Sequence, residues 1–550
     1  MERSPKRSSL SATAPITGKT VSSRVAATQP SVGPSDILPY AAARHPDKIA
    51  LVVGHTRLTY RDLDRMSDAV ADALHARGIG ANGVCSLYGQ NSWEWIVSYH
   101  GILKAGAVVN PINVMLTGPE LAFVLTDCGS GALFTGAAQA ATVDTILAEV
   151  PSLETVCQFG DPDESASATG AISFTDLLAT EASEPQDSRP RPQPEDLCSI
   201  GYTSGTTGHP KGAMQSQQSV LLNCALTATM HGRTTDDVVV TALPGAHVYG
   251  NVAINSTFLA GGTVILMERF TPGEALRLIE GEHATLFEGV PAMYSMMLAD
   301  PGFDTADLST LRAATIGGQT FAPELLARWQ NRAPVPVLEL WGMTELSGLG
   351  TTHAVHAPPV PGSIGVALPG LEVRIGPIDG TSGEVPAGEH GELLVRGPLV
   401  MLGYYGRPDA TAEAVTDDGW LRTGDVAYVD HTGHFFIVDR LKDMIVTAGY
   451  NVYPAEIERV IGAHPDVALV AVGGRPDPVK GEVAVAYVVP APEANLLPED
   501  IIEHCRGQLA AYKRPREVVF VDALPTTSSG KLMRRKLAEL DGDRGIVRER

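Results

Sequence analysis

One stretch of the chain, residues 202–212, combines residue types that together could bind a phosphate group. It reads YTSGTTGHPKG and contains three glycines, four serine or threonine side chains and Lys211. Glycines let backbone N–H groups close around phosphate oxygens, hydroxyls add hydrogen-bond donors, and a lysine adds positive charge. Residues 197–200 predict a short buried strand before this stretch, and residues 217–230 predict a helix after it. We therefore expect a phosphate-binding loop between a strand and a helix.

Two other interpretations of this stretch are an ordinary surface loop and a P-loop. A glycine- and hydroxyl-rich segment is often an ordinary surface loop, although a lysine between Pro210 and Gly212 argues against that here. The P-loop of nucleoside triphosphatases, G-x-x-x-x-G-K-S/T, does not match, because His209 and Pro210 separate Gly208 from Lys211 and no hydroxyl follows the lysine. A triphosphate bound here must be held in another way.

The stretch WGMTE at 341–345 carries residues suited to binding a nucleotide. It follows a predicted strand, and ligands of open parallel sheets bind beyond the carboxyl ends of the strands. Trp341 offers a flat face for a base, Thr344 a hydrogen-bond donor for phosphate, and Glu345 a hard oxygen ligand for magnesium. The alternative interpretation is a turn with a half-buried tryptophan.

Two shorter signals are weak when each stands alone. Asp425, in the tripeptide TGD at 423–425, puts a carboxylate on a turn, where it could accept hydrogen bonds from two ribose hydroxyls. Residues 525–531, PTTSSGK, form a second glycine- and hydroxyl-rich segment, which ends in Lys531. The tripeptide is common in proteins, and the second segment also fits a solvated tail with a surface lysine.

Composition and charge narrow the classes of function. The 550 residues exceed what one hydrophobic core usually holds, so we expect several domains. A formal net charge of −22 disfavours nonspecific binding to nucleic acid or to anionic membranes. The six cysteines include no C-x-x-C pair and no zinc-like spacing, which is typical of reduced thiols in a reducing compartment such as the cytoplasm. No apolar run approaches about 18 residues, so we expect no membrane span.

The alternation of predicted strands and helices indicates an α/β fold. From 36 to 127, and again from 197 to 340, short apolar strands alternate with helical segments, which predicts two doubly wound α/β subdomains with parallel sheets. Residues 160–195 are acidic and rich in proline and serine, and we expect a loop region there. From 362 to 434 the helical patterns stop, and strands between glycine and proline turns predict a small β subdomain.

The same patterns predict how the chain is divided. Residues 1–35 contain a single acidic residue and favour a disordered extension over a transit peptide, because no amphipathic apolar stripe is clear. A large N-terminal domain is expected at 36–438, and the charged stretch 439–443 separates it from a small, mobile α+β C-terminal domain at 444–540. A short tail, 541–550, follows.

In order and content, these motifs resemble the adenylate-forming superfamily of acyl-CoA synthetases, firefly-type luciferases and peptide-synthetase adenylation domains. The resemblance covers residues 36–540, and a chance match of all seven motifs in the superfamily's order is improbable. The motifs are YTSGTTGHPKG at 202–212, ALPGAHVYG at 242–250, GGQ at 317–319, WGMTE at 341–345, RTGD at 422–425, DRLKDMIVTAGYNVYP at 439–454 and PTTSSGK at 525–531.

The resemblance implies an ATP-dependent acid–CoA ligase that works in two steps. A carboxylate attacks the α-phosphorus of ATP to form acyl-AMP and release pyrophosphate, and the thiol of coenzyme A then attacks this mixed anhydride. Because two anions must meet, catalysis is mainly charge neutralisation and positioning. ATP, Mg²⁺, coenzyme A and a small carboxylic acid are the expected ligands. No nucleic acid partner is expected, and a homodimer is left open.

The resemblance also implies roles for individual residues in binding the nucleotide and the metal. The β- and γ-phosphates are expected at Thr203, Ser204, Gly205, Thr206, Thr207, Gly208 and Lys211. The adenine is expected beside Gly318, Gln319, Glu339, Leu340, Trp341 and Gly342, and the ribose at Asp425 and Arg440. Thr344 should contact the α-phosphate, and the metal ligands should be Glu345 and Thr206.

Four further residues are implied in catalysis and in movement between the two steps. Lys531 should bridge the α-phosphate and the substrate carboxylate, and His247 should lie beside the acyl pocket. Gly449 should lie in the tunnel for the pantetheine arm of coenzyme A. Lys442 should be the hinge about which the C-terminal domain rotates, so that Lys531 arrives for the first step and leaves for the second.

Two alternative functions and two departures from the superfamily pattern accompany this interpretation. A free-standing adenylation enzyme that loads a carrier protein stays open, although the insertion seen in stand-alone fatty acyl-AMP ligases is absent between Arg440 and Met444. An inactive adenylate-binding protein is disfavoured, because the key charged residues are all present: Lys211, Glu345, Asp425 and Lys531.

Trp341 stands where many relatives have tyrosine, and Gln319 stands where alanine is frequent.

The expected acid pocket is largely apolar. The segments that should line it are 247–251, 288–294, 317–319 and 343–348. They contain few charged residues, and the small residues Gly250, Gly289 and Gly348 leave room for a long tail. We therefore expect a medium- or long-chain fatty acid as the substrate, with an arylalkanoate or cinnamate-type acid as the alternative.

Overall fold

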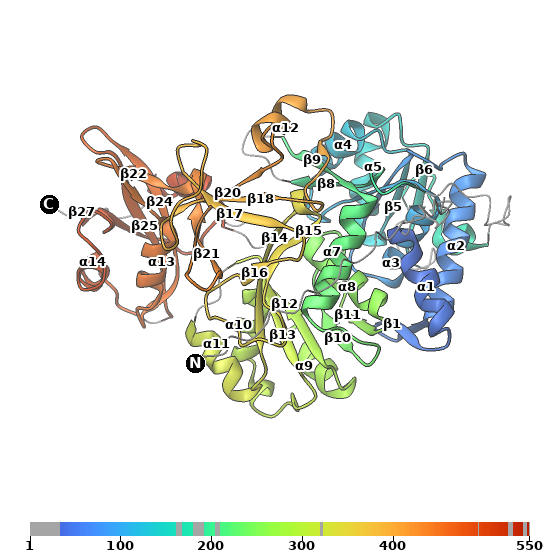
Figure 1. Ribbon diagram of the computed structural model, residues 1–550, viewed down its shortest axis with the longest axis horizontal. Helices are drawn as coiled ribbons and strands as arrows, with labels where there is room; N and C mark the ends of the chain where they lie inside the picture. The colour runs from blue at the N-terminus through green and yellow to red at the C-terminus, as the bar shows by residue number, and fades with distance from the viewer. Residues whose placement is uncertain are drawn as a thin grey trace, which may run out of the picture.

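A computed structural model describes residues 33–160, 168–179, 192–203, 209–319, 323–492, 494–525, 532–542 and 547–548. The strands of these residues form four sheets. In Figure 1 the blue-to-yellow part of the chain forms one large body, and the red-orange part with β22 to β27 forms a smaller body at the left. The α/β fold with a large N-terminal and a small C-terminal domain agrees with the prediction.

An eight-stranded sheet supports the first α/β subdomain. Its strand order is β19-β9-β8-β4-β3-β5-β6-β7. From β8 to β7 all neighbours run parallel, and β9 and β19 add an antiparallel edge. The strands are β3 Val84–Tyr88, β4 Val108–Pro111, β5 Ala132–Thr135, β6 Thr155–Gln158, β7 Ile172–Ser173, β8 Leu197–Thr203, β9 Lys211–Ser216 and β19 Gly403–Tyr404.

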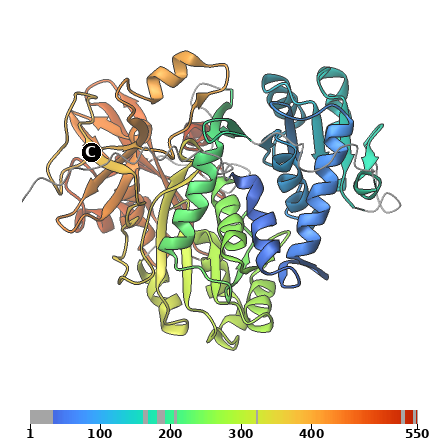
Figure 2. The ribbon, with the colours of Figure 1, turned by 45° about the vertical axis from the view of Figure 1, so that its right-hand side comes forward.

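A nine-stranded sheet supports the second α/β subdomain, and Figure 2 shows the two subdomains as neighbouring bodies. Its strand order is β16-β15-β14-β13-β12-β10-β11-β1-β2. The strands are β1 Ile49–Val53, β2 Thr56–Thr59, β10 Val238–Thr241, β11 Thr263–Leu266, β12 Leu286–Gly289, β13 Ala313–Gly317, β14 Val337–Met343, β15 Gly348–Thr352 and β16 Val366–Ala367.

One strand assignment to a subdomain was wrong. Residues 36–127 were assigned to the first subdomain, but β1 pairs in parallel with β11, with Leu51 beside Val264, and so joins the second sheet. The central residues of β1, Ala50 to Val52, are almost completely buried. Such a strand is stable only where both faces of the sheet are covered, and β11 offers that environment.

Helices cover both α/β sheets. They are α1 Ile37–Arg44, α2 Tyr60–Ala76, α3 Trp93–Lys104, α4 Gly118–Asp127, α5 Ala140–Ile146, α6 Phe174–Leu178, α7 Gln217–Met230, α8 Val248–Ala260, α9 Pro272–Gly281, α10 Pro291–Ala299 and α11 Pro323–Arg332. Helix α2 illustrates why they form: Thr59 caps it by a reciprocal pair of bonds with Asp62, both 3.1 Å long. Its apolar stripe, with Leu63, Val70 and Leu74, is fully buried.

Two regions predicted to lack helices contain short ones. The expected loop region 160–195 includes β7 and α6, because Phe174 and Leu177 are buried in the first subdomain. The expected helix-free stretch 362–434 includes α12, Pro408–Ala414. Pro408 occupies the first turn of α12, where its missing N–H costs nothing.

The remaining two sheets form the β subdomain and the C-terminal domain. The β subdomain has the order β17-β18-β20-β21, with β17 Glu372–Gly376, β18 Gly391–Arg396, β20 Leu421–Val429 and β21 Phe435–Arg440. The C-terminal domain contains β22 Ile445–Thr447, β23 Tyr450–Val452, β24 Val467–Asp477, β25 Gly481–Pro490, β26 Glu517–Phe520, β27 Val547–Arg548, α13 Pro454–Gly462 and α14 Pro498–Arg506. It has an apolar core of its own, to which Ile457, Val472 and Ile501 belong.

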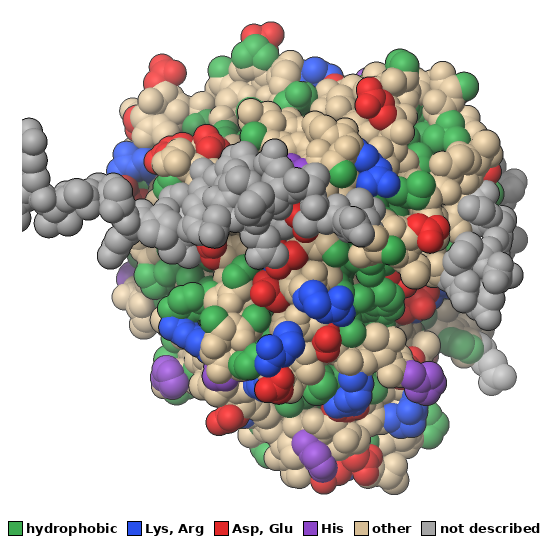
Figure 3. Space-filling model, turned by 90° about the vertical axis from the view of Figure 1, so that its right-hand side faces the viewer, with side chains coloured by type: hydrophobic (Ala, Val, Ile, Leu, Met, Phe, Trp, Pro, Cys, Tyr) green, Lys and Arg blue, Asp and Glu red, His purple; other side chains and the backbone are tan. Residues whose placement is uncertain are grey.

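Three observations describe the surface charge, the helices and the cysteines. On the face shown in Figure 3, acidic and basic side chains are interspersed and no continuous basic area is visible. Among the described residues, no helix combines the length and the apolar character needed to cross a bilayer. All six cysteines are buried free thiols.

Candidate active site

The stretch predicted to bind phosphate is flanked by two paired strands, β8 and β9, here called the phosphate hairpin, which corrects the predicted strand–loop–helix arrangement. Strands β8 and β9 pair antiparallel, with Tyr202 opposite Gly212 and Thr203 opposite Lys211. The Thr203 hydroxyl donates to the Lys211 carbonyl oxygen at 3.4 Å. Lys211 therefore begins a strand, and α7 starts only after β9 ends. The other predicted phosphate ligands lie outside the described residues: Ser204, Gly205, Thr206, Thr207 and Gly208.

Helix α4 braces the base of this hairpin through residues that the motifs did not reveal. The His209 ring stacks on Phe123 with centroids 4.9 Å apart. The Tyr202 hydroxyl donates to Asp127 Oδ2 at 2.7 Å, and Arg407 Nη2 donates to Asp127 Oδ1 at 2.6 Å. Asp127 and Arg407 are distant in sequence, so no local pattern signals their contact.

The stretch 341–345 was predicted to follow a strand, but β14 continues to Met343, so only Thr344 and Glu345 lie beyond its carboxyl end. The Thr344 carbonyl oxygen accepts a bond from Gln215 Nε2 at 2.9 Å. Gly201 of β8 lies so close that a Cβ atom there would come within 2.4 Å of Thr344 Cγ2. This close approach places the 344–345 turn directly against the phosphate hairpin.

Glu345 is held by a residue outside every motif, Tyr404. The Glu345 carboxylate is buried, with 6% of the residue exposed, and its Oε1 accepts a bond from the Tyr404 hydroxyl at 2.8 Å. Lys211 Nζ lies 5.3 Å from the centroid of the Tyr404 ring. Burial raises the pKa of Tyr404, and the negative charge of Glu345 adds to the effect, so the hydroxyl stays a donor at neutral pH.

The donor set at Glu345 fits magnesium. Among the described residues, no three histidine, cysteine or acidic side chains converge into a metal cage. Mg²⁺ in nucleotide sites typically takes one or two carboxylates and fills its other positions with phosphate oxygens and water. Glu345 beside the phosphate hairpin supplies such a carboxylate, while Thr206, the second predicted ligand, lies outside the described residues.

The predicted ribose-binding pair is assembled on β20 and β21. Asp425 and Arg440 are paired neighbours across the two strands, and Arg440 Nε lies 2.7 Å from Asp425 Oδ1. The indole N–H of Trp341 donates to Asp425 Oδ2 at 2.8 Å. The structure thus brings together three residues that the sequence had assigned to two neighbouring parts of the nucleotide.

The predicted adenine-binding residues lie at the ends of β13 and β14. Gly317 pairs with Leu340 in register, and the two residues that follow, Gly318 and Gln319, are exposed. Gly318 has a φ of 89°, a conformation that favours glycine. At Gly342, which is also exposed, a Cβ would come within 2.1 Å of a backbone oxygen, so only glycine fits there.

Glu339, one of the predicted adenine-binding residues on β14, has a shifted pKa. Its carboxylate is buried, with 6% of the residue exposed, and Oε1 accepts a bond from the Gly362 N–H at 2.8 Å. Burial raises its pKa to about 7, against the influence of that bond. The side chain consequently changes charge near neutral pH.

His247 lies at the start of α8, where the acid pocket was predicted. It occupies the N-cap position, and its Nδ1 accepts a bond from the Tyr249 N–H at 3.3 Å. The ring is exposed. This local bond fixes the entry of α8 next to the strand end of β10.

Part of the predicted acid-pocket lining is core instead. Tyr294 is fully buried in the hydrophobic core beneath β12. Glu288 forms a buried ion pair with Arg233, with side chains 1% and 0% exposed. Burial raises the pKa of Glu288, and the guanidinium opposes this rise. The polar interior of this region was not apparent from the sequence.

The residues predicted to act in the C-terminal domain are only partly described. Lys442 is exposed, in a short 3₁₀ turn, Leu441–Asp443. Gly449 has a φ of 82° and open space where a Cβ would lie. Lys531 lies outside the described residues. The hinge, the tunnel and the bridging lysine stay predictions.

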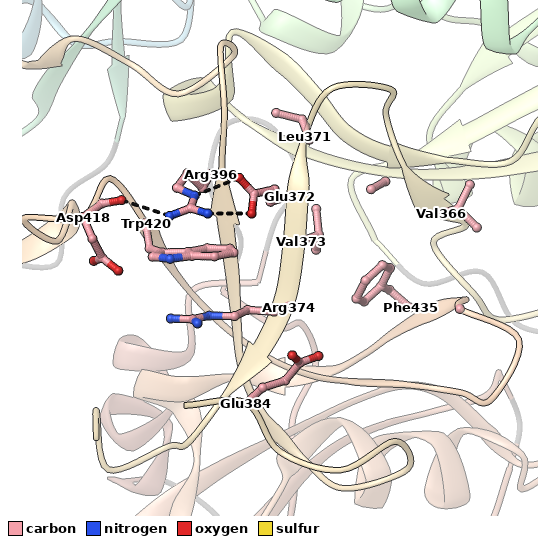
Figure 4. A pocket seen from close by; sticks show the side chains of 12 residues that line it. Val366, Leu371, Glu372, Val373, Arg374, Glu384, Arg396, Asp418, Trp420 and Phe435 are labelled. Carbon is pink, nitrogen blue, oxygen red and sulfur yellow. Dashed lines mark hydrogen bonds and ion pairs between the residues drawn. The ribbon is translucent and has the colours of Figure 1, made fainter. Parts of the chain in front are cut away.

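A hollow of about 770 Å³ on the β subdomain, shown in Figure 4, contains none of the predicted site residues. Trp420 lies between the guanidinium groups of Arg374 and Arg396, whose Cζ atoms are 4.1 and 4.7 Å from its ring centroid. Arg396 also forms bonds of 2.9 and 2.6 Å with Glu372. The indole ring of Trp420 therefore makes cation–π contacts on both of its faces.

Comparison with family models divides the chain much as the fold does. Residues 38–405 match the model described as AMP-binding enzyme. Residues 456–531 match the model described as AMP-binding enzyme C-terminal domain.

Individual relatives are similar over almost the whole chain. A feruloyl-CoA synthase of an Amycolatopsis species is 38% identical over 90% of this chain and 96% of its own. A long-chain-fatty-acid–CoA ligase of Bacillus subtilis is 33% identical over 92% and 93%. A crystal structure of an anthranilate CoA ligase with anthranoyl-AMP has a TM-score of 0.85, at 28% identity over 92% of this chain and 97% of that one.

Proposed function

The chain belongs to the family of AMP-binding enzymes and is an AMP-forming acid–CoA ligase, and from this premise we propose that its substrate is an aryl-substituted carboxylic acid. The acid would carry its ring directly or through a short linker. This choice departs from the fatty acid that the sequence alone favoured.

The packing of the pocket glycines carries this proposal. A Cβ at Gly250 would come within 2.1 Å of the Pro244 carbonyl oxygen, and one at Gly348 within 2.6 Å of Val252 Cγ2. At Gly289 an added Cβ would be in tight contact, at 3.2 Å. These glycines permit close packing and do not open a long channel, which supports a compact acid over an extended alkyl chain.

Polar groups near the pocket add support. The Tyr249 hydroxyl and Thr315 Oγ1 are 2.7 Å apart, and Tyr249 also packs among apolar residues such as Leu243 and Val252. Both side chains are buried, so this part of the predicted lining is polar, which fits a substituted ring better than a purely apolar alkyl chain. The similarity to a feruloyl-CoA synthase and to an anthranilate CoA ligase points in the same direction.

The site residues would perform the first step by charge neutralisation. Lys211 and the hairpin tip would bind the β- and γ-phosphates, and Asp425 with Arg440 would hold the ribose. Thr344 would contact the α-phosphate, and Glu345 would bind magnesium. When bound with ATP, magnesium offsets the charge of the triphosphate as pyrophosphate leaves. Lys531 would bring the substrate carboxylate to the α-phosphate.

The acid specificity can be measured directly. Pyrophosphate release is followed with ferulate, coumarate, phenylacetate, octanoate, palmitate and acetate, and thioester formation with coenzyme A is checked by mass spectrometry. We expect at least one aryl acid to exceed octanoate and palmitate by tenfold or more in kcat/KM. A preference for octanoate or palmitate would overturn the aryl assignment, and a preference for acetate would overturn the apolar pocket itself.

A medium- or long-chain fatty acid is the second candidate. It is favoured by the 33% identity to the Bacillus subtilis long-chain-fatty-acid–CoA ligase. The same acid panel separates the two candidates, because octanoate and palmitate test chain length independently of the ring.

A further inference from the structure

The short strand β19 lies beside the strand that begins with Lys211. It forms the edge of the eight-stranded sheet, with Gly403 opposite Met214 and Tyr404 opposite Ala213 of β9. The flanking residues extend the pairing, because the Tyr405 N–H donates to the Gly212 carbonyl oxygen at 2.8 Å. Tyr404 is therefore fixed to the strand that begins with Lys211.

The chain around β19 contacts Glu345 twice. The Met401 N–H donates to the Glu345 carbonyl oxygen at 2.8 Å, and the Tyr404 hydroxyl donates to Glu345 Oε1 at 2.8 Å. Both the backbone and the carboxylate of Glu345 are thus held from the same segment. The contact crosses 59 positions of sequence, and no motif includes Tyr404.

Tyr404 also contacts the second charged residue of the site. Its ring faces the Lys211 ammonium at 5.3 Å from the centroid, within the range of a cation–π contact. One side chain therefore restrains the carboxylate and the ammonium together.

We propose that Tyr404 is a positioning residue for the metal–ATP complex: its hydroxyl fixes the Glu345 carboxylate, and its ring fixes Lys211. The inference rests on the proposed roles of Glu345 and Lys211. A buried carboxylate that is already held by a hydrogen-bond donor does not have to be ordered when the metal–nucleotide complex arrives, which lowers the entropic cost of binding.

The test is Tyr404→Phe, which removes one oxygen and keeps the ring beside Lys211. Binding of Mg²⁺ with the α,β-methylene analogue of ATP is measured by calorimetry, and Mn²⁺ binding with the same analogue by electron paramagnetic resonance. We expect both affinities to fall about tenfold, the size expected for a hydrogen bond to a charged group. Affinity for AMP, which lacks the β- and γ-phosphates, should stay unchanged.

The neighbouring Tyr405→Phe variant is the matched control. Tyr405 packs in a different cluster, with Ile200 and Val108, and its substitution should leave all affinities unchanged. The inference is overturned if Tyr404→Phe binds the metal–analogue complex with wild-type affinity. It is also overturned if Tyr404→Phe loses AMP affinity by the same factor, or if Tyr405→Phe loses affinity for the metal–analogue complex by the same factor. If the wild-type enzyme binds the ATP analogue with the same affinity with and without Mg²⁺, the proposed role of Glu345 is contradicted instead.

Discussion

At the scale of single residues, the site depends on buried polar groups that the fold has already partnered. Asp425 is 4% exposed, and its two oxygens accept from Trp341 and pair with Arg440. Glu345 is held by Tyr404 in the same way. Such groups keep their orientation before a ligand binds, because each alternative orientation would leave a buried donor or acceptor without its bond.

His100 is a buried residue whose burial favours the uncharged form of its side chain. The ring lies in α3, is 1% exposed, and packs 6.0 Å from the Phe258 ring. Burial lowers its pKa from 6.5 to about 3, and the charge of Lys104 adds to the effect. The folded protein keeps this ring neutral while the unfolded chain gains a proton below its own pKa. Stability is therefore fully present above about pH 6.5 and is lost as the pH falls toward 3.

We predict that His100→Leu weakens the acid sensitivity of the fold. Between pH 7.5 and pH 5, protonation of the unfolded chain at this residue alone should cost about 2 kcal/mol of stability. The drop in Tm between these pH values, measured by scanning calorimetry, should be a few degrees smaller in the variant. The exposed His431, changed to leucine, should leave the drop unchanged. Equal drops in wild type and His100→Leu would contradict this account.

At the scale of elements, the phosphate hairpin depends on a helix from elsewhere in the first subdomain. Helix α4 reaches β8 through Asp127 and the hairpin through Phe123. A two-stranded hairpin is only marginally stable by itself, so these contacts should help to hold β8 and β9 in place. Arg407, which also bonds to Asp127, ties the segment after β19 to the same helix.

We predict that Asp127→Asn loosens the hairpin without unfolding the enzyme. The Asp127 side chain is 12% exposed, so loss of its charge should weaken the bond to Arg407 substantially. The KM for ATP should rise about three- to tenfold, and hydrogen exchange should quicken at residues 197–216. Glu120→Gln on the same helix keeps the capping bonds to Thr117 and serves as the control. Unchanged exchange in Asp127→Asn would exclude α4 as a brace.

At the scale of the whole molecule, the proposed chemistry requires two bodies to work on one site. The phosphate hairpin, Glu345 and Asp425 lie in the large body, whereas Lys531 is at the far end of the C-terminal family match, which spans residues 456–531. The C-terminal domain has its own sheet and core, so it can move as a unit. Such a movement would let Lys531 serve the first step and be absent from the second.

We predict that Lys531→Ala separates the two steps. Loss of one group that stabilises developing charge should slow acyl-AMP formation about 10²- to 10³-fold. Thioester formation from supplied acyl-AMP should largely survive. Pyrophosphate release measures the first step, and thioester mass spectrometry the second. The exposed Lys536, changed to alanine, should affect neither step. An equal loss of both steps in Lys531→Ala would contradict the two-conformation account.

The sequence alone determined the features that depend on local patterns. Alternating apolar segments predicted the α/β fold, which the structure confirms, and short motifs predicted Lys211, Thr344, Glu345 and Asp425 as site residues. Such predictions are possible because strand and helix periodicity, and the residue types that bind phosphate or metal, are encoded within a few neighbouring positions.

Only the tertiary structure decided which distant residues meet. In the structure β1 pairs with β11, and residues 211–216 form a strand. Tyr404 contacts Glu345, and Asp127 contacts Arg407. The structure also showed that Gly348 is tightly packed, where composition had suggested open space. The physical reason is that pairing partners and packing distances are set by burial against other elements, and a single chain segment carries no record of them.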